Sequence, residues 1–254
     1  MGSAIASCSS PGQPELQEPL SPPASPTPLA TWRPTQPVVE SPPPASSTPT
    51  ESYAFPTQLD PTRRYLIYLH GKIVEDQGLP AISPVYGEYQ YTEILKALES
   101  YGFVVISEQR PKDADGWEYA RKGARQVEEL ISAGVPPSHI TVVGASKGAS
   151  IATGISNLVG NSEVNYVLLG SCHPSLIEEW KQQGVTLSGN VLAIYDIADD
   201  EYSGSCADLF ARSEGKGLGK YSELVLQVGT GHGILYQPLQ EWVEPTVRWA
   251  NQEW

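Results

Sequence analysis

The segment Ile140-Thr141-Val142-Val143-Gly144-Ala145-Ser146-Lys147-Gly148 decides the fold of this chain. An apolar, β-branched run enters a Gly-x-Ser-x-Gly turn, and the residues that follow, up to about Leu158, favour a helix. A strand that enters a helix through such a turn exposes the central serine side chain at the top of a sheet. The segment therefore predicts a buried strand, a sharp turn at Ser146 and a helix.

Strands and helices alternate on both sides of this motif. Val/Ile/Leu-rich runs predict further strands, and apolar residues at helical spacing predict helices between them. The predicted strands are residues 65–69, 103–106, 164–169, 191–195 and 224–228, and the predicted helices are about 89–100, 116–133, 175–183, 206–213 and 238–251. This alternation is typical of an α/β fold. We expect a mostly parallel sheet of about six strands with helices on both faces.

The first 52 residues differ in composition from the rest of the chain. Of the 23 prolines, 15 lie at or before Pro61, and Trp32 is the only aromatic residue before residue 50. Such a segment buries too little apolar surface to offset the entropy lost on ordering. We therefore predict a disordered Pro/Ser-rich segment over residues 1–52 and a single folded domain over residues 53–254.

The three cysteines allow different interpretations. Cys8 follows Ile5-Ala6-Ser7, which resembles a bacterial lipobox, but only seven residues precede it, too few for a signal peptide. Two locations stay open: the cell envelope, with membrane anchoring through a lipidated Cys8, and the cytoplasm. Cys172 and Cys206 lie in two loops that could meet, so a disulfide and two free thiols are both open.

Charge and composition exclude several classes of protein. The net charge is −13, and all but two of these charges fall after residue 50. A surface of that sign repels nucleic acid, and the chain has no basic cluster, so we expect no nucleic-acid partner. It has no run of 18 apolar residues and no Cys/His spacing of a metal site. We accordingly predict no metal and no cofactor.

The residue order predicts a catalytic triad. A serine hydroxyl is a weak nucleophile until a base accepts its proton. Among the four histidines only His232 follows a plausible acid in the order serine, acid, histidine, so we expect Ser146 as nucleophile and His232 as base. The acid is expected in the loop after the second strand beyond the serine, where the spacing favours Asp199 over Asp200 and Asp196.

Backbone groups near the serine are the expected oxyanion hole. The residue after the nucleophile, Lys147, and the residue after the His70-Gly71 turn, Lys72, are predicted to supply the two N–H donors. Whether these lysine side chains bind an anionic substrate or reach solvent is open.

The long segment 72–89 is rich in Gly, Pro and Tyr and is expected over the mouth of the site. It is interpreted either as a substrate-shaping loop or as a structural excursion. Gly71 and Tyr86 are the predicted substrate-binding residues, and Tyr89 and Tyr91 are further candidates for stacking on a substrate.

The order of these motifs resembles the α/β-hydrolase superfamily over about residues 60–254, and residues 134–148 are similar to small hydrolases of the esterase or dienelactone-hydrolase type. The resemblance implies an α/β-hydrolase fold and a carboxylesterase-like serine hydrolase that acts on a small-molecule acyl substrate through an acyl-enzyme. A peptidase, thioesterase or acyltransferase would use the same residues. The alternative of another class is a non-catalytic, ligand-binding envelope domain on this fold. The oligomeric state does not follow from these patterns.

Overall fold

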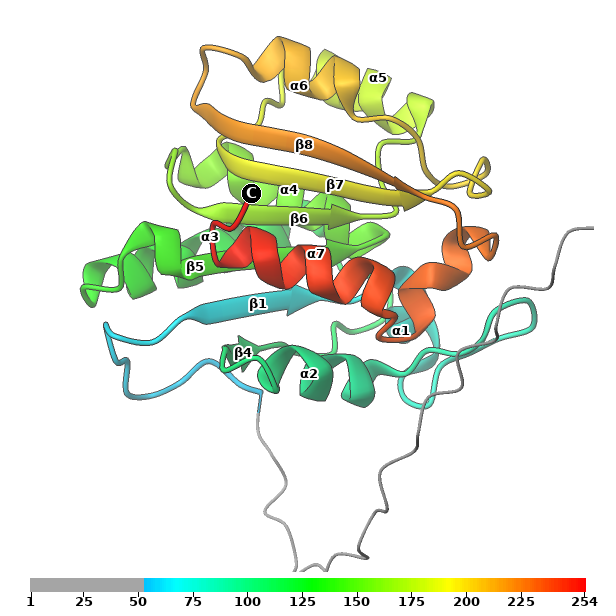
Figure 1. The fold of residues 1–254 in the computed structure, drawn as a ribbon, viewed down its shortest axis with the longest axis horizontal. Helices are drawn as coiled ribbons and strands as arrows, with labels where there is room; N and C mark the ends of the chain where they lie inside the picture. The colour runs from blue at the N-terminus through cyan, green and yellow to red at the C-terminus, as the bar shows by residue number, and fades with distance from the viewer. Residues whose placement is uncertain (1–52) are drawn as a thin grey trace, which may run out of the picture. The chain divides into compact units, whose positions relative to one another are not determined.

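A six-stranded sheet forms the centre of residues 53–254, the part of the chain that this computed structural model describes. The strand order is β4-β1-β5-β6-β7-β8, and every neighbouring pair is parallel (Figure 1). The strands are β1 (Tyr65–Leu69), β4 (Val104–Ile106), β5 (Ile140–Ala145), β6 (Asn165–Leu169), β7 (Gly189–Asp196) and β8 (Leu218–Leu226). The predictions for Cys8 and for residues 1–52 lie outside the described residues.

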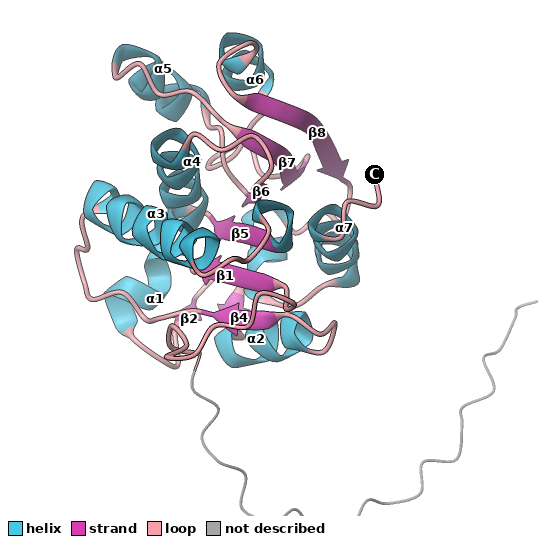
Figure 2. Cartoon of the chain, turned by 90° about the vertical axis from the view of Figure 1, so that its left-hand side faces the viewer, coloured by secondary structure: helices cyan, strands magenta, loops and turns pink. Residues whose placement is uncertain are grey.

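Helices cover both faces of this sheet (Figure 2). One face carries α3 (Gly116–Ser132), α4 (Lys147–Val159), α5 (Pro174–Gln182) and α6 (Ala207–Ser213), and the other carries α2 (Tyr91–Glu99) and α7 (Gln240–Ala250). Short 3₁₀ turns, η1 (Pro137–His139) and η2 (Gly231–Tyr236), precede β5 and α7. The predicted α/β fold, a parallel sheet of six strands with helices on both faces, is confirmed.

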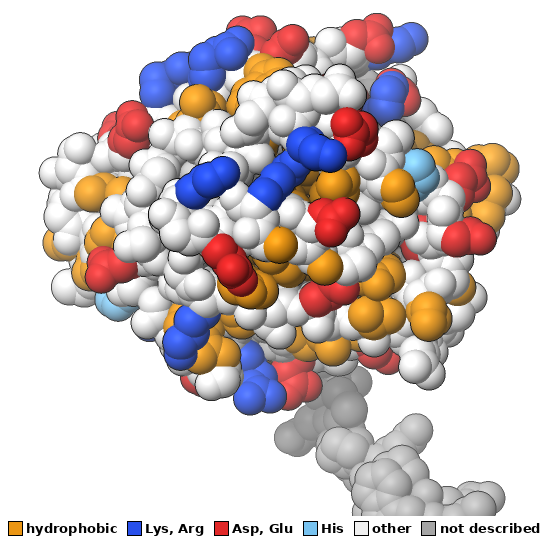
Figure 3. Space-filling view, turned by 90° about the horizontal axis from the view of Figure 1, so that it is seen from above, with side chains coloured by type: hydrophobic (Ala, Val, Ile, Leu, Met, Phe, Trp, Pro, Cys, Tyr) orange, Lys and Arg blue, Asp and Glu red, His pale blue; other side chains and the backbone are white. Residues whose placement is uncertain are grey.

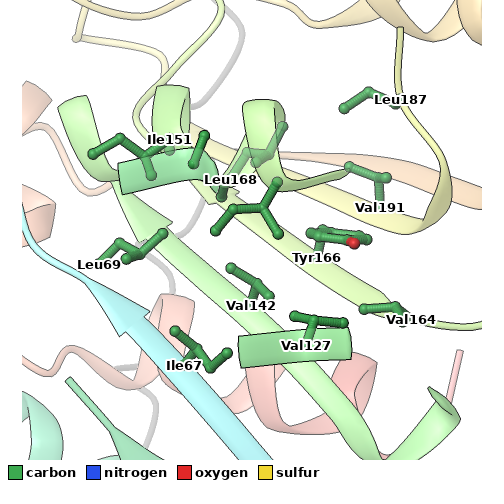
Figure 4. Packing of buried hydrophobic residues seen from close by; sticks show 14 of the residues in the cluster. Ile67, Leu69, Val127, Val142, Ile151, Val164, Tyr166, Leu168, Leu187 and Val191 are labelled. Atoms are coloured by element: carbon green, nitrogen blue, oxygen red, sulfur yellow. The ribbon is translucent and has the colours of Figure 1, made fainter. Parts of the chain in front are cut away.

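The alternation of side chains along each strand divides the core into two layers. In β1, Tyr65, Ile67 and Leu69 pack on one side, while Leu66 and Tyr68 pack on the other. Figure 4 shows the first layer, in which side chains of β1, β5 and β6 meet those of α3 and α4. Because β1, β5 and β6 are buried on both faces, apolar residues fill successive positions, which is why these strands could be predicted as continuous apolar runs.

Two regions differ from the expectation. Segment 72–89, expected as a loop, contains helix α1 (Lys72–Gln77) and a two-stranded antiparallel ribbon of β2 (Ile82–Ser83) and β3 (Gly87–Glu88). The helix gave no apolar signal because one of its two buried residues is the charged Glu75. Strand β8 begins six residues earlier than expected, since its first half is largely exposed and lacks an apolar run.

Cys172 and Cys206 form a disulfide across 34 residues of sequence, which decides between the two alternatives left open for them. The bridge joins the turn after β6 to the start of α6, and both cysteines are 1% exposed. Cys172 also pairs with Ser203 through an isolated antiparallel bridge. The loop after β7 is therefore fastened to the turn after β6. Among the helices of residues 53–254, none has the length and apolar character needed to cross a bilayer.

Replacing both bridge cysteines, Cys172→Ser with Cys206→Ser, is expected to lower the free energy of unfolding by about 3–4 kcal/mol, because the cross-link restricts the unfolded chain. Urea denaturation followed by tryptophan fluorescence measures this difference, with Cys8→Ser as the control that keeps the bridge. A loss below about 1 kcal/mol would show that the bridge contributes little to stability.

Candidate active site

Ser146 occupies a strained turn between β5 and α4. Its backbone has φ 53° and ψ −118°, a region that residues with a side chain rarely adopt. A Cβ atom at Gly144 would overlap the Gly148 carbonyl, and one at Gly148 would overlap the Leu69 carbonyl. Only glycine at positions 144 and 148 allows α4 to pack this close to β5 and β1, so both glycines of the Gly-x-Ser-x-Gly motif are sterically required.

Ser146, His232 and Asp199 form a continuous hydrogen-bonded chain beyond the carboxyl ends of the strands. His232, in η2, lies with its Nε2 atom 2.9 Å from Ser146 Oγ. Its Nδ1 atom lies 2.6 Å from Asp199 Oδ2 in the turn after β7. With the Nδ1 proton donated to the carboxylate, the Nε2 lone pair faces the serine hydroxyl. This is the arrangement that general-base activation of a serine requires.

Of the three candidate acids, the structure brings only Asp199 to the imidazole. Asp199 also accepts hydrogen bonds from the Ser203 hydroxyl and the Tyr202 N–H. Burial by itself would raise the pKa of Asp199, but the hydrogen bonds from His232 and Ser203 outweigh it and lower the pKa. Asp196 instead accepts from the backbone of Ala198 and Gly229, and Asp200 is exposed.

Two residues that the sequence did not single out hold the His232 ring. Gly170, just after β6, has φ 60°, and a Cβ there would lie 3.2 Å from His232 Cε1. On another side, the Tyr202 ring centroid is 4.9 Å from that of the imidazole. No local motif marks either residue, because each is recognisable only through its contact with a residue distant in sequence. A glycine directly after a predicted strand is the only available hint.

The two expected oxyanion donors both lie at the beginning of a helix. Lys147 is the first residue of α4 and Lys72 the first of α1, so neither N–H has an acceptor within its own helix. A Cβ at Gly71 would lie 3.6 Å from Ser146 Cβ, which places the start of α1 against the serine. The structure thus brings Gly71, and the turn that carries Lys72, to the site.

The lysine side chains are occupied by carboxylates rather than directed to a free anion site. Lys147 Nζ lies 2.5 Å from Glu75 Oε2 and donates to the Ala114 carbonyl at 2.6 Å. Lys72 Nζ lies 2.5 Å from Asp76 Oδ1. Within residues 53–254, no cluster of three His, Cys, Asp or Glu side chains has the geometry of a metal site.

The tyrosines of segment 72–89 and its neighbour Tyr91 separate into two groups. Tyr86 packs on Tyr236, with ring centroids 5.2 Å apart, and against Gly233, which follows His232. It therefore lies at the edge of the site. Tyr89 and Tyr91, the further candidates for stacking on a substrate, are instead buried, with their hydroxyls bonded to Tyr68 and Ser107. Their role is structural because a hydroxyl buried in the core needs a partner.

His70, the end of β1, is a buried structural histidine. Its Nε2 atom accepts from the Arg110 backbone N–H at 2.9 Å. Burial and the nearby Arg110 charge lower its pKa to about 3, so the imidazole stays neutral near pH 7.

The similarity of this chain to known proteins is one of structure. No family model matches the chain, and no curated protein matches it. A sugar hydrolase from Lactococcus lactis is 11% identical over 79% of this chain and 92% of its own, with a TM-score of 0.47. A Bacillus cereus carboxylesterase is 15% identical over 77% and 91%, with a TM-score of 0.46. A truncated carbohydrate esterase from gut microbiota is 16% identical over 80% and 94%, with a TM-score of 0.49. These likenesses assign no activity to the chain.

Acidification is expected to destabilise the fold through His70. The unfolded imidazole binds a proton near pH 6.5, whereas the folded one resists protonation down to about pH 3. The contribution of His70 to the free energy of unfolding is therefore fully present above pH 6.5. It decreases as the pH drops, with a slope that approaches about 1.4 kcal/mol per pH unit. Denaturant unfolding at several pH values between 7 and 5 measures this slope. His70→Gln, which keeps an acceptor for Arg110, should reduce it, and equal slopes in the two proteins would exclude His70 as the cause.

Proposed function

We propose that this chain is a serine hydrolase that cleaves an ester or related acyl bond in a small molecule, with Ser146 as nucleophile, His232 as general base and Asp199 as the orienting acid. The observation that carries the proposal is the unbroken series of hydrogen bonds from Ser146 Oγ through the imidazole to the Asp199 carboxylate. The family resemblance of the sequence motifs supports the same assignment.

The course of the proposed reaction follows from the hydrogen bond between the Ser146 hydroxyl and His232 Nε2. Ser146 Oγ attacks the carbonyl carbon of the substrate as its proton passes to His232 Nε2, and the carbonyl oxygen becomes an oxyanion. The tetrahedral intermediate collapses, the C–O bond to the alcohol breaks, and the alcohol leaves with the proton from His232. A water molecule then attacks the acyl-enzyme, its proton passes to His232 and on to Ser146, and the acid is released.

Asp199 and the two backbone donors stabilise the charges that develop in these steps. Because its pKa is lowered, the carboxylate stays ionised at neutral pH and faces the imidazolium that forms at His232. The N–H groups of Lys147 and Lys72 are the proposed donors to the oxyanion. The strained backbone at Ser146 favours catalysis over mere ligand binding, since such strain costs about 1–3 kcal/mol and concentrates at functional sites.

A fluorophosphonate probe tests the proposal. The native protein should be labelled, and Ser146→Ala and His232→Ala should abolish labelling because they remove the nucleophile and its base. Asp199→Asn should lower kcat for an aryl ester by about 10⁴-fold, since the imidazole loses its orienting carboxylate. Ser150→Ala, one turn along α4, is the matched control and should label like the native protein. A folded native protein that the probe does not label would overturn the assignment.

The charges around the site favour neutral or cationic substrates over anionic ones. The carboxylate of Glu201 raises the pKa of the Tyr202 hydroxyl, beside His232, to about 12. Burial raises the pKa of Tyr86, and the charges of Asp199 and Glu201 raise it further. Acidic and apolar side chains share the right-hand end of the surface in Figure 3, the end where the strands terminate. The side chains of Lys72 and Lys147, which lie next to the site, are already paired with carboxylates.

Substrate charge can be varied with aryl acetates of 3-hydroxybenzoate, 3-tert-butylphenol and 3-hydroxyphenyl-trimethylammonium, of which the last two have the same shape. At low ionic strength kcat/KM should be about tenfold lower for the anionic ester than for the neutral one, and the difference should shrink with salt. Glu201→Gln should reduce the difference in kcat/KM between the anionic and the neutral ester, whereas Glu128→Gln, on α3, should leave that difference unchanged. Equal rates for the three esters, or a faster anionic one, would contradict this assignment.

A further inference from the structure

Three charged side chains form a cluster beside the Ser146 turn, and the proposed reaction does not use them directly. Glu75 of α1 is 3% exposed and Arg110, in the segment after β4, is 2% exposed. Arg110 Nε lies 2.6 Å from Glu75 Oε1, and Lys147 Nζ lies 2.5 Å from Glu75 Oε2. Each oxygen of one buried carboxylate therefore has its own cation.

Arg110 extends this cluster to the end of β1. Its guanidinium donates to the His70 carbonyl, and its backbone N–H donates to His70 Nε2. His70 directly precedes Gly71, from which α1 begins. The cluster consequently joins the end of β1, helix α1, the segment after β4 and the first residue of α4.

Burying such a cluster is expensive, and stability alone does not account for it. Desolvation of charged groups often cancels the gain from pairing them, and an apolar replacement of equal volume is frequently as stable. What a buried charge cluster adds is geometry, because each partner must keep its position or leave a charge unpaired. Here the cluster fixes the turn at Gly71, which lies against Ser146, and Lys147, which follows Ser146.

We propose that Glu75 is a positioning residue for the oxyanion hole, an inference that rests on the proposed hydrolase function. Glu75 lies three residues after Lys72 on α1, and it pairs with the side chain of Lys147, the residue that follows Ser146. The carboxylate thereby links the helix that carries one oxyanion donor to the residue that carries the other. Its second oxygen, through Arg110, holds the turn that leads into the first donor.

A positioning role for Glu75 predicts a large effect on the chemical step and a small effect on substrate binding. Glu75 is buried and acts through the backbone, so it contributes little to binding the ground-state ester. The oxyanion exists only after attack by Ser146, so misplaced donors raise the energy of the transition state alone. Removing the Glu75 charge should therefore lower kcat, leave KM nearly unchanged and weaken binding of a boronic acid, whose tetrahedral adduct with Ser146 resembles the intermediate.

Helix α1 supplies a matched control. Glu75 and Asp76 are adjacent acids on the same six-residue helix, and each pairs with a lysine. Asp76, however, is exposed and pairs with the exposed side chain of Lys72. Asp76→Asn thus removes the same charge from the same helix without touching the buried cluster.

The experiment measures kcat, KM and the Kd of a phenylboronic acid for the native protein, Glu75→Gln and Asp76→Asn, each normalised to active sites titrated with a fluorophosphonate. Loss of one oxyanion donor costs about 10²–10³-fold in kcat, so displaced donors should cost about 10- to 100-fold. Glu75→Gln should show that loss in kcat and a parallel loss in boronic acid affinity, with KM within about threefold of native. Asp76→Asn should match the native protein.

Other outcomes overturn the inference in distinguishable ways. If the native protein neither labels nor hydrolyses esters, the proposed function itself fails. If the native protein is active and Glu75→Gln has native kcat per titrated site, then Glu75 serves stability alone. Should Glu75→Gln fail to fold, Lys147→Met breaks the same link from the other side, and Lys147→Arg restores a cation. The inference then requires the kcat loss in Lys147→Met and its recovery in Lys147→Arg, and a native kcat in Lys147→Met overturns it.

Discussion

The contact between the Gly144–Gly148 turn and the end of β1 is the constraint on which the rest of this structure depends. The carbonyl of Leu69 and the backbone of Gly148 approach so closely that no side chain fits between them. This contact forces Ser146 into its positive φ and directs α4 back over the sheet. Because β5 and β1 are neighbours, it also brings the Gly71 turn against the serine.

The base and the acid depend on a second set of constraints, made between loops. Gly170 leaves room for the His232 ring, and the Ser203 hydroxyl holds the Asp199 carboxylate. Ser203 is in turn paired with Cys172, whose disulfide to Cys206 ties the turn after β6 to the loop after β7. The alignment of the proposed triad therefore rests on covalent and hydrogen-bonded links among segments that carry no motif of their own.

Charge is distributed in two ways around this site. Inside, the buried Glu75 carboxylate pairs with both Arg110 and Lys147. Outside, the carboxylate of Glu201 raises the pKa of the Tyr86 and Tyr202 hydroxyls. In the proposed reaction the two arrangements would act on different steps: the first on the geometry at the reacting carbonyl, the second on the charge of the molecule that approaches it.

The sequence by itself determined the alternating fold, the sharp turn at Ser146 and the pairing of Ser146 with His232, because strand periodicity and motif order can be recognised along the chain. It did not predict α1, whose buried face includes the charged Glu75, nor the burial of Tyr89 and Tyr91. Only the tertiary structure decided which carboxylate meets the imidazole, that both lysine side chains are paired, and that Cys172 is bonded to Cys206. Each of these depends on distances between segments far apart in sequence, which are set when the sheet and its loops pack together.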